Sequence, residues 1–298
     1  MKVVVSIPAY NEEQTLGRVL TDIKKVMAGL QYEYVISIVD DGSTDKTAEI
    51  ARQHGASVYS HPYNCGLAEA FRSEISKAIS LGADIIVHTD ADGQYPAEEI
   101  PKLLQEINNG ADLVLGSRFL GRIESMPLLK RAGNMAFSKA ISQITRAKIT
   151  DAQTGFRAFT KKVAQIKIIS NHTYTQEQVI RALKNRYIVK EVPITARKTR
   201  ESRLMRSHPL VQPFEYAVKA WINLFRIYRD FEPLKFFGYF GAGFFIAGAI
   251  LGAWLIYLFA RFGRIGHLPS TILTMLLIIT AIQIWLFGFL ADMIKHEK

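Results

Sequence analysis

Acidic side chains follow an apolar segment at three places in the first hundred residues. The three motifs are Pro8-Ala9-Tyr10-Asn11-Glu12, Asp40-Asp41-Gly42-Ser43-Thr44-Asp45 and Asp90-Ala91-Asp92-Gly93-Gln94. Carboxylates that are brought together repel one another and lose hydration, so they usually share a cation or a ligand rich in hydrogen-bond donors. We therefore expect these motifs to form a binding site if the fold brings them together.

Asp90 and Asp92 have the spacing that most clearly indicates a metal site. In an extended chain, residues two apart point the same way, so both carboxylates can face one ion. Mg²⁺ and Mn²⁺ are typically held by one or two carboxylates, waters and phosphate oxygens of a substrate. With a diphosphate bound, such an ion neutralises the charge that develops on the leaving group. Taken alone, the pair is equally typical of a chance Asp-Gly turn.

The elements that must position these motifs follow from the alternation of apolar and amphipathic segments. Asn11 is a candidate N-cap of the first helix, and Pro96 stands near the first position of the fourth. Strands that alternate with helices predict an α/β fold, a mostly parallel sheet with helices on both faces. Ligands of such sheets bind beyond the carboxyl ends of the strands, where the three motifs would converge. The expected strands are 3–7, 34–39, 56–59, 85–88 and 113–115, and the expected helices are 12–27, 45–54, 67–80 and 96–108.

The second half of the chain follows a different pattern. An amphipathic helix is expected over 126–147, and a second βαβ-like stretch runs through 180–183 to 188–194. The segment 208–228 combines aromatic and basic residues, which suits the headgroup region of a membrane, although an ordinary core helix has the same pattern. We expect a catalytic domain over 1–206, juxtamembrane amphipathic helices over 207–232 and a membrane anchor over 233–298.

Two uncharged runs, 236–260 and 268–291, are long enough to cross a hydrocarbon core of roughly 30 Å as helices. A buried hairpin in a large soluble protein is the alternative. Gly248 and Gly252 form a G-x-x-x-G pair that can pack helices within one chain or between chains, so a homo-oligomer is possible. The basic residues that flank the spans favour a multi-pass protein of the cell membrane with its catalytic domain and C-terminus cytoplasmic, although Arg261 and Arg264 in the connecting loop oppose this.

The net charge of +10 is concentrated before the first uncharged run, because residues 181–235 hold 13 Lys/Arg and five Asp/Glu. A basic segment beside a span is attracted to anionic headgroups. Nucleic-acid binding is the other interpretation of a basic chain, but no RNP, KH or zinc-finger pattern is present. The single cysteine, Cys65, rules out an internal disulfide framework. We therefore expect a lipid bilayer, and no nucleic acid, as the partner of the basic segment.

Together with three later segments, the motifs resemble family 2 glycosyltransferases with the GT-A (Rossmann-like) fold. The later segments are Gly116-Ser117-Arg118, Asp151-Ala152-Gln153-Thr154-Gly155-Phe156-Arg157, and Glu191-Val192-Pro193-Ile194 followed by Arg197, Arg200, Ser202 and Arg203. They are similar to the branch that makes dolichyl- or undecaprenyl-phosphate sugars and that also carries two C-terminal spans. Glu201-Ser202-Arg203 departs from the Gly-Ser-Lys often seen there, with loss of the glycine but not of the basic charge.

The resemblance implies roles for individual residues. A nucleotide sugar would be bound by Pro8, Ala9, Tyr10, Glu12, Asp40, Asp41, Gly66, Asp90 and Ala91. Mg²⁺ or Mn²⁺ would be held by Asp90, Asp92 and Gln94, and the acceptor phosphate by Arg118, Arg131, Ser138, Arg200 and Arg203. The expected catalytic residues are Asp92, Arg118, Arg131 and Arg200. Arginine suits phosphate because its planar fork binds two oxygens at once, although Arg131 is equally typical of a solvated helix face. Gly155 is expected to adopt a backbone angle that other residues resist.

These substrates make sugar transfer to a polyprenyl phosphate (dolichyl phosphate is one) the expected reaction. A phosphate monoester is largely ionised at neutral pH and attacks the anomeric carbon without a strong base. Catalysis then consists of alignment and charge neutralisation, with inversion, and no base is assigned, although Asp92 and Glu177 are conceivable. The alternatives are a processive polysaccharide synthase, transfer to a soluble glycan or protein, and a non-catalytic membrane scaffold. GDP-mannose, UDP-glucose and UDP-N-acetylglucosamine all fit as donors.

Overall fold

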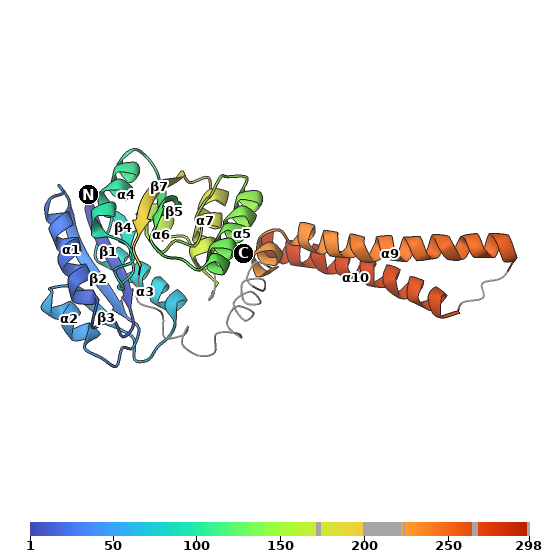
Figure 1. Cartoon of the computed structure of the whole chain (residues 1–298), viewed down its shortest axis with the longest axis horizontal. Coiled ribbons are helices and arrows are strands. Elements are labelled where there is room, and N and C mark those ends of the chain that lie inside the picture. Colours follow the sequence, from blue (N-terminus) through green and yellow to red (C-terminus); the bar gives the residue numbers. More distant parts are fainter. Residues whose placement is uncertain (171–173, 199–221, 223–224, 264–267, 297–298) are drawn as a thin grey trace. The chain divides into compact units, whose positions relative to one another are not determined.

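The computed structural model describes residues 1–170, 174–198, 222, 225–263 and 268–296 (Figure 1). The chain divides into two compact units, Met1–Lys219 and Ala220–Lys298. The first unit is an α/β domain, and the second consists mainly of two long helices. Each unit is described by itself.

A seven-stranded sheet, in the order β3-β2-β1-β4-β6-β5-β7, forms the centre of the first unit (Figure 1). Strands β3, β2, β1 and β4 are parallel, and β5 pairs in parallel with β7. Only β6, inserted between β4 and β5, runs antiparallel to its neighbours. The predicted α/β fold with a mostly parallel sheet is therefore confirmed. The strands are β1 (Lys2–Ala9), β2 (Glu33–Asp40), β3 (Ser57–Ser60), β4 (Ile85–His88), β5 (Leu113–Ile123), β6 (Arg157–Thr160) and β7 (Val189–Ala196).

The helices of the first unit connect these strands. The first helix starts four residues later than expected, because Asn11 does not cap it. Asn11 has a positive φ of 54° and is held by the next loop, since its backbone N–H donates to Ser43 Oγ at 3.0 Å. Thr15 is the N-cap instead. The helices are α1 (Leu16–Ala28), α2 (Thr47–Gln53), α3 (Leu67–Ser80), η1 (Ala97–Glu99), α4 (Ile100–Asn108), α5 (Leu128–Thr145), α6 (Lys161–Ala164) and α7 (Tyr174–Lys184).

The main core lies between one face of the sheet and helices α1 and α4. Alternate residues of β1, namely Val3, Val5 and Ile7, are fully buried there, as the period of two of a strand requires. Leu20 of α1 and Leu103 of α4 are buried in the same cluster. Each such aliphatic side chain contributes about 1.5–3 kcal/mol when it leaves water. This core fixes the positions of β1 and β4, whose carboxyl ends carry two of the three motifs.

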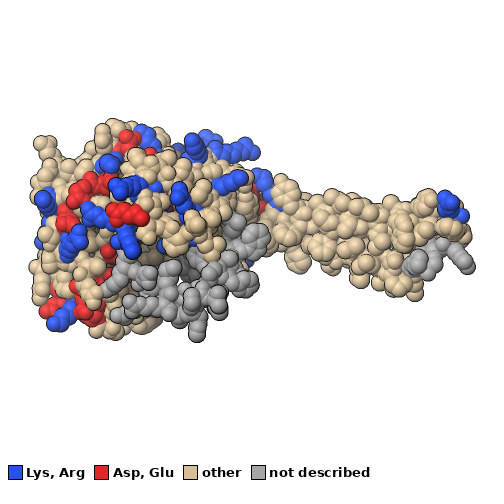
Figure 2. All heavy atoms as spheres, viewed as in Figure 1, with Lys and Arg blue, Asp and Glu red and all other residues tan. Residues whose placement is uncertain are grey.

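The second unit contains the helices α9 (Pro233–Phe262) and α10 (Leu268–His296), which pack as a hairpin. Both are long and apolar enough to cross a membrane, and the face shown in Figure 2 carries charged side chains only near the hairpin's ends. A Cβ atom on Gly248 would lie 2.9 Å from Ile278, and one on Gly252 would lie 3.3 Å from Thr274. The G-x-x-x-G pair therefore serves close packing of α9 on α10 within the chain.

Candidate active site

The three acidic motifs converge at one edge of the sheet, as the parallel topology predicted. Strand β1 lies between β2 and β4, with Ala9 paired with Asp40 and Ser6 with His88. The backbone N–H of Asp41 donates to the carbonyl of Ala9 at 2.8 Å. The carboxyl ends of β1, β2 and β4 are therefore neighbours, and the motifs that follow them surround one place.

The loops after β1 and β2 hold each other by side-chain to backbone hydrogen bonds. The N–H of Glu12 donates to Thr47 Oγ1 at 2.8 Å, and Asn11 Oδ1 accepts from the N–H of Thr44 at 2.9 Å. Asp40 Oδ1 accepts from the N–H of Ser43 at 3.0 Å. Tyr10 remains 46% exposed, so its ring is available to a ligand. The hydrogen bonds between the two loops give this edge of the site a fixed shape.

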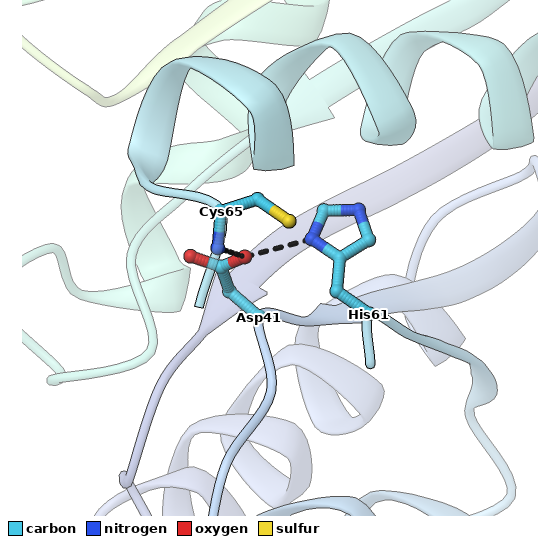
Figure 3. Close-up of side chains that lie close together, drawn as sticks. All are labelled: Asp41, His61 and Cys65. Atoms are coloured by element: carbon cyan, nitrogen blue, oxygen red, sulfur yellow. Dashed lines mark hydrogen bonds and ion pairs between the residues drawn. The ribbon is translucent and has the colours of Figure 1, made fainter. Parts of the chain in front are cut away.

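Asp41 is already occupied by partners within the protein (Figure 3). Its Oδ1 atom lies 2.7 Å from His61 Nδ1 and accepts from the N–H of Cys65 at 2.9 Å, while Oδ2 accepts from the N–H of Gly66 at 2.9 Å. His61 Nε2 in turn lies 2.8 Å from Ser73 Oγ. Asp41, His61 and Cys65 place possible metal ligands within 4.8 Å of one another. Because three N–H groups occupy the Asp41 carboxylate, we interpret the group as a clamp on the turn at Gly66.

Asp90 and Asp92 lie in a turn after β4, so the extended chain assumed for them is wrong. The turn is closed by the N–H of Gln94, which donates to Asp92 Oδ1 at 2.9 Å. The two carboxylates nevertheless influence each other. Burial is the main cause that raises the pKa of Asp90 to about 6, and the charge of Asp92 adds to it, while His88 and Arg118 oppose it. Burial also raises the pKa of Asp92.

These carboxylates fit a hard divalent cation. In the part of the chain that the structure describes, no hydrogen-bond donor contacts the carboxylate of Asp90, although the side chain is partly buried. A buried carboxylate without a donor is costly unless a cation shares it. Two carboxylates beside a place for diphosphate oxygens are the donor set that Mg²⁺ and Mn²⁺ prefer. Asp90 and Asp92 are thus the residues best suited to hold such an ion.

Gly155 makes room for Asp90, which differs from the expectation for this glycine. Its φ is not positive, so the backbone angle does not require glycine. A Cβ atom at this position would instead lie 3.0 Å from Asp90 Oδ1 and 3.1 Å from Oδ2. A side chain at this position would therefore press on the Asp90 carboxylate, and the predicted reason is wrong.

Arg118, at the end of the buried part of β5, is bound to Asp151. Its Nε and Nη2 atoms donate to the two oxygens of Asp151 at 2.7 and 2.8 Å, and both residues are buried. Glu191 of β7 fixes the partner, because its carboxylate accepts from the backbone N–H groups of Thr150 and Asp151 at 2.9–3.0 Å. The segments that resembled a family in the sequence therefore build one network around Arg118.

Helix α5 contributes cations and a buried hydroxyl. Arg131 is exposed in its first turn, whereas Ser138 is buried and its Oγ accepts from the N–H of Ala152 at 3.1 Å. Lys130 was not predicted as a site residue. Lys130 is exposed, yet desolvation and the charge of Arg118 lower its pKa, while Asp92 and Asp90 oppose this shift, so its charge interacts with both carboxylates. Only its position beside Arg131 in the sequence hinted at this.

Three other expected or conceivable site residues have different outcomes. Arg200 and Arg203 lie outside the described residues. Glu177, considered as a base, has its carboxylate occupied by the N–H groups of Ile169 and Ser170 and by Arg181 Nε, at 2.6–3.1 Å. It serves in the described structure as a support for the start of α7.

A pocket of about 190 Å³ lies beside Asp92, between α1, the Asp92–Gly93 turn and the end of β7. Its lining includes Arg18, Arg197 and Lys198. The backbone N–H of Arg197 donates to the carbonyl of Gln94 at 2.9 Å. The chain that leads from β7 toward Arg200 and Arg203 is thus attached directly to the turn that carries Asp92.

Two family models match the chain. Residues 4–166 match glycosyl transferase family 2, and residues 232–296 match the GtrB C-terminal hairpin. The first match covers the strands and turns that carry all three acidic motifs. The second covers α9 and α10.

Individual proteins agree with these matches. A dolichyl-phosphate hexose transferase of Haloferax volcanii is 38% identical over 198 residues, which are 65% of this chain and 82% of that protein. A UDP-N-acetylglucosamine–dolichyl-phosphate N-acetylglucosaminyltransferase of Methanococcus voltae is 33% identical over 214 residues, 63% of this chain and 82% of that protein. Among solved structures, glucosyl-3-phosphoglycerate synthase of Mycobacterium tuberculosis with Mn²⁺, UDP-glucose and phosphoglyceric acid has a TM-score of 0.57 at 19% identity, covering 75% of this chain and 79% of that one. The last likeness supports the fold.

Proposed function

The chain belongs to glycosyl transferase family 2, and from this membership and the geometry of the site we propose that it transfers a hexose from a nucleotide diphosphate sugar to a polyprenyl phosphate. The reaction would depend on a divalent metal and invert the anomeric carbon. The observation that carries the proposal is the convergence of the acidic motifs at the carboxyl ends of β1, β2 and β4. The charges of Arg118 at β5 and Lys130 in the first turn of α5 act on the carboxylates there.

This combination of charges suits two phosphorylated substrates. The carboxylate of Asp90, which has no donor among the described residues, and that of Asp92 provide a place for a cation beside the donor diphosphate. Mg²⁺ or Mn²⁺ there would neutralise the leaving group. The basic residues Arg118, Lys130 and Arg131 provide charge for the phosphate of the acceptor. An ionised phosphate needs little help from a base, which agrees with the occupied carboxylate of Glu177. The contribution of these residues is alignment and charge compensation.

The nucleotide part of the donor is assigned to the edge formed by the loops after β1 and β2. Tyr10 offers an exposed ring there for the base. One carboxylate oxygen of Asp40 accepts from Ser43, and the other has no hydrogen-bond partner among the described residues. Asp41 acts through the clamp that fixes the turn at Gly66. The donor hexose and nucleotide are GDP-mannose, UDP-glucose or UDP-N-acetylglucosamine, which share the diphosphate that this site is suited to bind.

The two apolar helices support a lipid acceptor. An enzyme held at the membrane surface meets a polyprenyl phosphate in the same thin layer, with the phosphate at the interface and the tail in the bilayer. We assign α9 and α10 as a membrane anchor, with the catalytic domain and the C-terminus on the cytoplasmic side. A homo-oligomer that packs through the outer faces of the hairpin is compatible with this assignment.

Acceptor competition tests this proposal. Purified full-length protein receives a labelled nucleotide sugar with either polyprenyl phosphate, the matching polyprenol, or a soluble phosphate monoester. We expect transfer only to the polyprenyl phosphate. Equal transfer to the soluble monoester would favour a glycosyltransferase with a non-lipid acceptor. If no mixture shows sugar transfer or hydrolysis of the nucleotide sugar with any GDP- or UDP-hexose, the proposal is contradicted.

A further inference from the structure

Arg157, the first residue of β6, is a buried cation without a carboxylate partner among the described residues. It is fully buried, and its guanidinium donates only to neutral oxygens. Nη1 donates to the carbonyl of Thr175 at 3.1 Å and to Gln178 Oε1 at 2.9 Å, and Nη2 donates to the carbonyl of Thr154. Burial lowers the pKa of Arg157 to about 10, so it still carries its charge at neutral pH. A buried charge of this kind is expensive and is weak evidence for a stabilising role.

Arg157 connects α7 to the strand pair that precedes the turn with Asp90 and Asp92. In the antiparallel pairing of β4 with β6, Arg157 is opposite His88, two residues before Asp90. Two of its acceptors belong to α7, and the third is the carbonyl of Thr154 in the segment before β6. The same guanidinium therefore fixes the peptide that joins Thr154 to Gly155.

Other contacts also hold the segment 154–156 in place. The N–H of Gly155 donates to the Tyr95 hydroxyl at 3.4 Å, and the carbonyl of Phe156 accepts from the N–H of Gly116 at 2.8 Å. The rings of Tyr95 and Phe156 stack with their centroids 5.2 Å apart. Asp90 packs against this segment, since a Cβ on Gly155 would lie 3.0 Å from Asp90 Oδ1, 3.1 Å from its Oδ2 and 3.4 Å from its Cγ.

We propose that Gly155 and Arg157 are positioning residues for the metal-binding carboxylate of Asp90. Arg157 holds the peptide between Thr154 and Gly155 in place, and Gly155, which has no side chain, lets the Asp90 carboxylate lie directly against that peptide. No donor in the described chain orients Asp90, so this contact surface takes the place of the hydrogen bonds that usually orient a metal ligand. The inference rests on the proposed assignment of Asp90 and Asp92 to a divalent ion.

Unpaired buried polar atoms support a functional reason for this layer. Five buried side-chain atoms of residues on α3, β4, β6 and α7 lack a hydrogen-bond partner among the described residues. They are Glu74 Oε1, His88 Nε2, Arg157 Nε, Thr160 Oγ1 and Gln178 Nε2. Natural proteins tolerate such atoms mainly where function requires the arrangement. The region behind Asp90 is therefore not optimised for stability.

Direct measurement of Mn²⁺ binding tests the proposal. The EPR signal of free Mn²⁺ gives its dissociation constant for the full-length protein in detergent, in the absence of acceptor. Gly155→Ala should weaken Mn²⁺ binding by about tenfold or more, because the added methyl group pushes the Asp90 carboxylate from its place. Arg157→Lys keeps the charge but loses the planar fork, and it should weaken binding in the same direction. Gly17→Ala is the matched control, since a Cβ there meets its nearest neighbour at an ordinary 3.4 Å.

Thermal unfolding without metal and the variant Asp90→Asn separate the outcomes. Gly155→Ala should unfold close to the wild-type temperature while binding Mn²⁺ more weakly, a combination that a purely structural role does not produce. Asp90→Asn should lose the Mn²⁺ site. If Asp90→Asn loses Mn²⁺ binding but Gly155→Ala and Arg157→Lys keep wild-type affinity, the positioning role is wrong. If Asp90→Asn itself binds Mn²⁺ like the wild type, the metal assignment of the proposed function fails, and this inference fails with it.

Discussion

Arg118 and Asp151 form a buried ion pair in which two guanidinium nitrogens meet two carboxylate oxygens at 2.7 and 2.8 Å. The backbone N–H of Arg118 donates to the same carboxylate at 3.0 Å. The pair therefore joins β5 to the segment before β6.

Removal of Asp151 should destabilise the protein strongly. Asp151→Ala leaves a buried guanidinium without compensation, and the loss of such a partner typically costs about 3–5 kcal/mol. Urea denaturation of the full-length protein in detergent measures this change. Glu33→Ala, which breaks the exposed Lys2–Glu33 pair, should change stability by less than about 1 kcal/mol. Equal effects of the two variants would show that the Arg118–Asp151 pair is not buried as described.

The pH dependence of metal-free stability should reveal Asp90. Burial raises the pKa of Asp90 from its ordinary 3.8 to about 6. A carboxyl whose pKa is raised on folding stabilises the fold fully below its ordinary pKa, and this contribution is lost as the pH rises through about 6. Two pKa units correspond to about 3 kcal/mol. Relative to Asp90→Asn, metal-free wild type should lose stability between pH 4 and pH 7.5, and saturating Mn²⁺ should restore it.

Thermal unfolding across this pH range provides the check. Parallel curves for wild type and Asp90→Asn would contradict a raised pKa for Asp90, whereas convergence at low pH would support it. The comparison needs no substrate, so it is independent of the identity of the donor and acceptor.

Arg131 should contribute to acceptor binding but not to donor binding. It is exposed in the first turn of α5, next to Lys130, whose charge interacts with the carboxylates of Asp90 and Asp92. Arg131→Ala should raise the KM for polyprenyl phosphate about tenfold, the equivalent of a single charge-assisted contact of about 1.4 kcal/mol, with little change in the donor KM. Lys139→Ala, another exposed cation of the same helix, is the control. Equal responses from the two variants would assign Arg131 to a solvated helix face.

The packing of the hairpin predicts different effects for two neighbouring glycines of α9. Gly248 has no room for a Cβ because Ile278 would be 2.9 Å away, whereas Gly243 has no atom within 4 Å of that position. Gly248→Ile should therefore lower the thermal stability of the detergent-solubilised protein by several degrees, and Gly243→Ile should not. The reverse result would indicate that α9 and α10 pack through other faces.

Most of the fold was predictable from the chain because its signals are local. The apolar run at 3–7 is the centre of β1, the run at 85–88 is the whole of β4, and the helix 67–80 was predicted to the residue. The start of α1 was not, since Asn11 is held by Ser43 of a loop 32 residues away, and no local pattern shows such a contact. The antiparallel β6 was missed for the same reason, because strand direction depends on long-range pairing.

The site was predictable in composition but not in its interactions. The convergence of Asp40, Asp90 and their neighbours followed from the expected parallel direction of the strands. The occupied state of Asp41 and the nearness of Lys130 to Asp92 depend on side-chain placement across loops. Gly155 shows this most clearly, because a glycine required by space and one required by backbone angle are identical in sequence.

Transfer of a labelled hexose into the organic-soluble lipid fraction tests the central claim most directly. Full-length wild type and Asp92→Ala are incubated with polyprenyl phosphate and a panel of GDP- and UDP-hexoses, with Mn²⁺ or Mg²⁺ or with a chelator. Wild type should form a polyprenyl-phosphate hexose with one donor and only in the presence of metal, and Asp92→Ala should lose at least about 100-fold in rate. Undiminished transfer by Asp92→Ala or in chelator, or no lipid-linked product from any donor, would contradict the account.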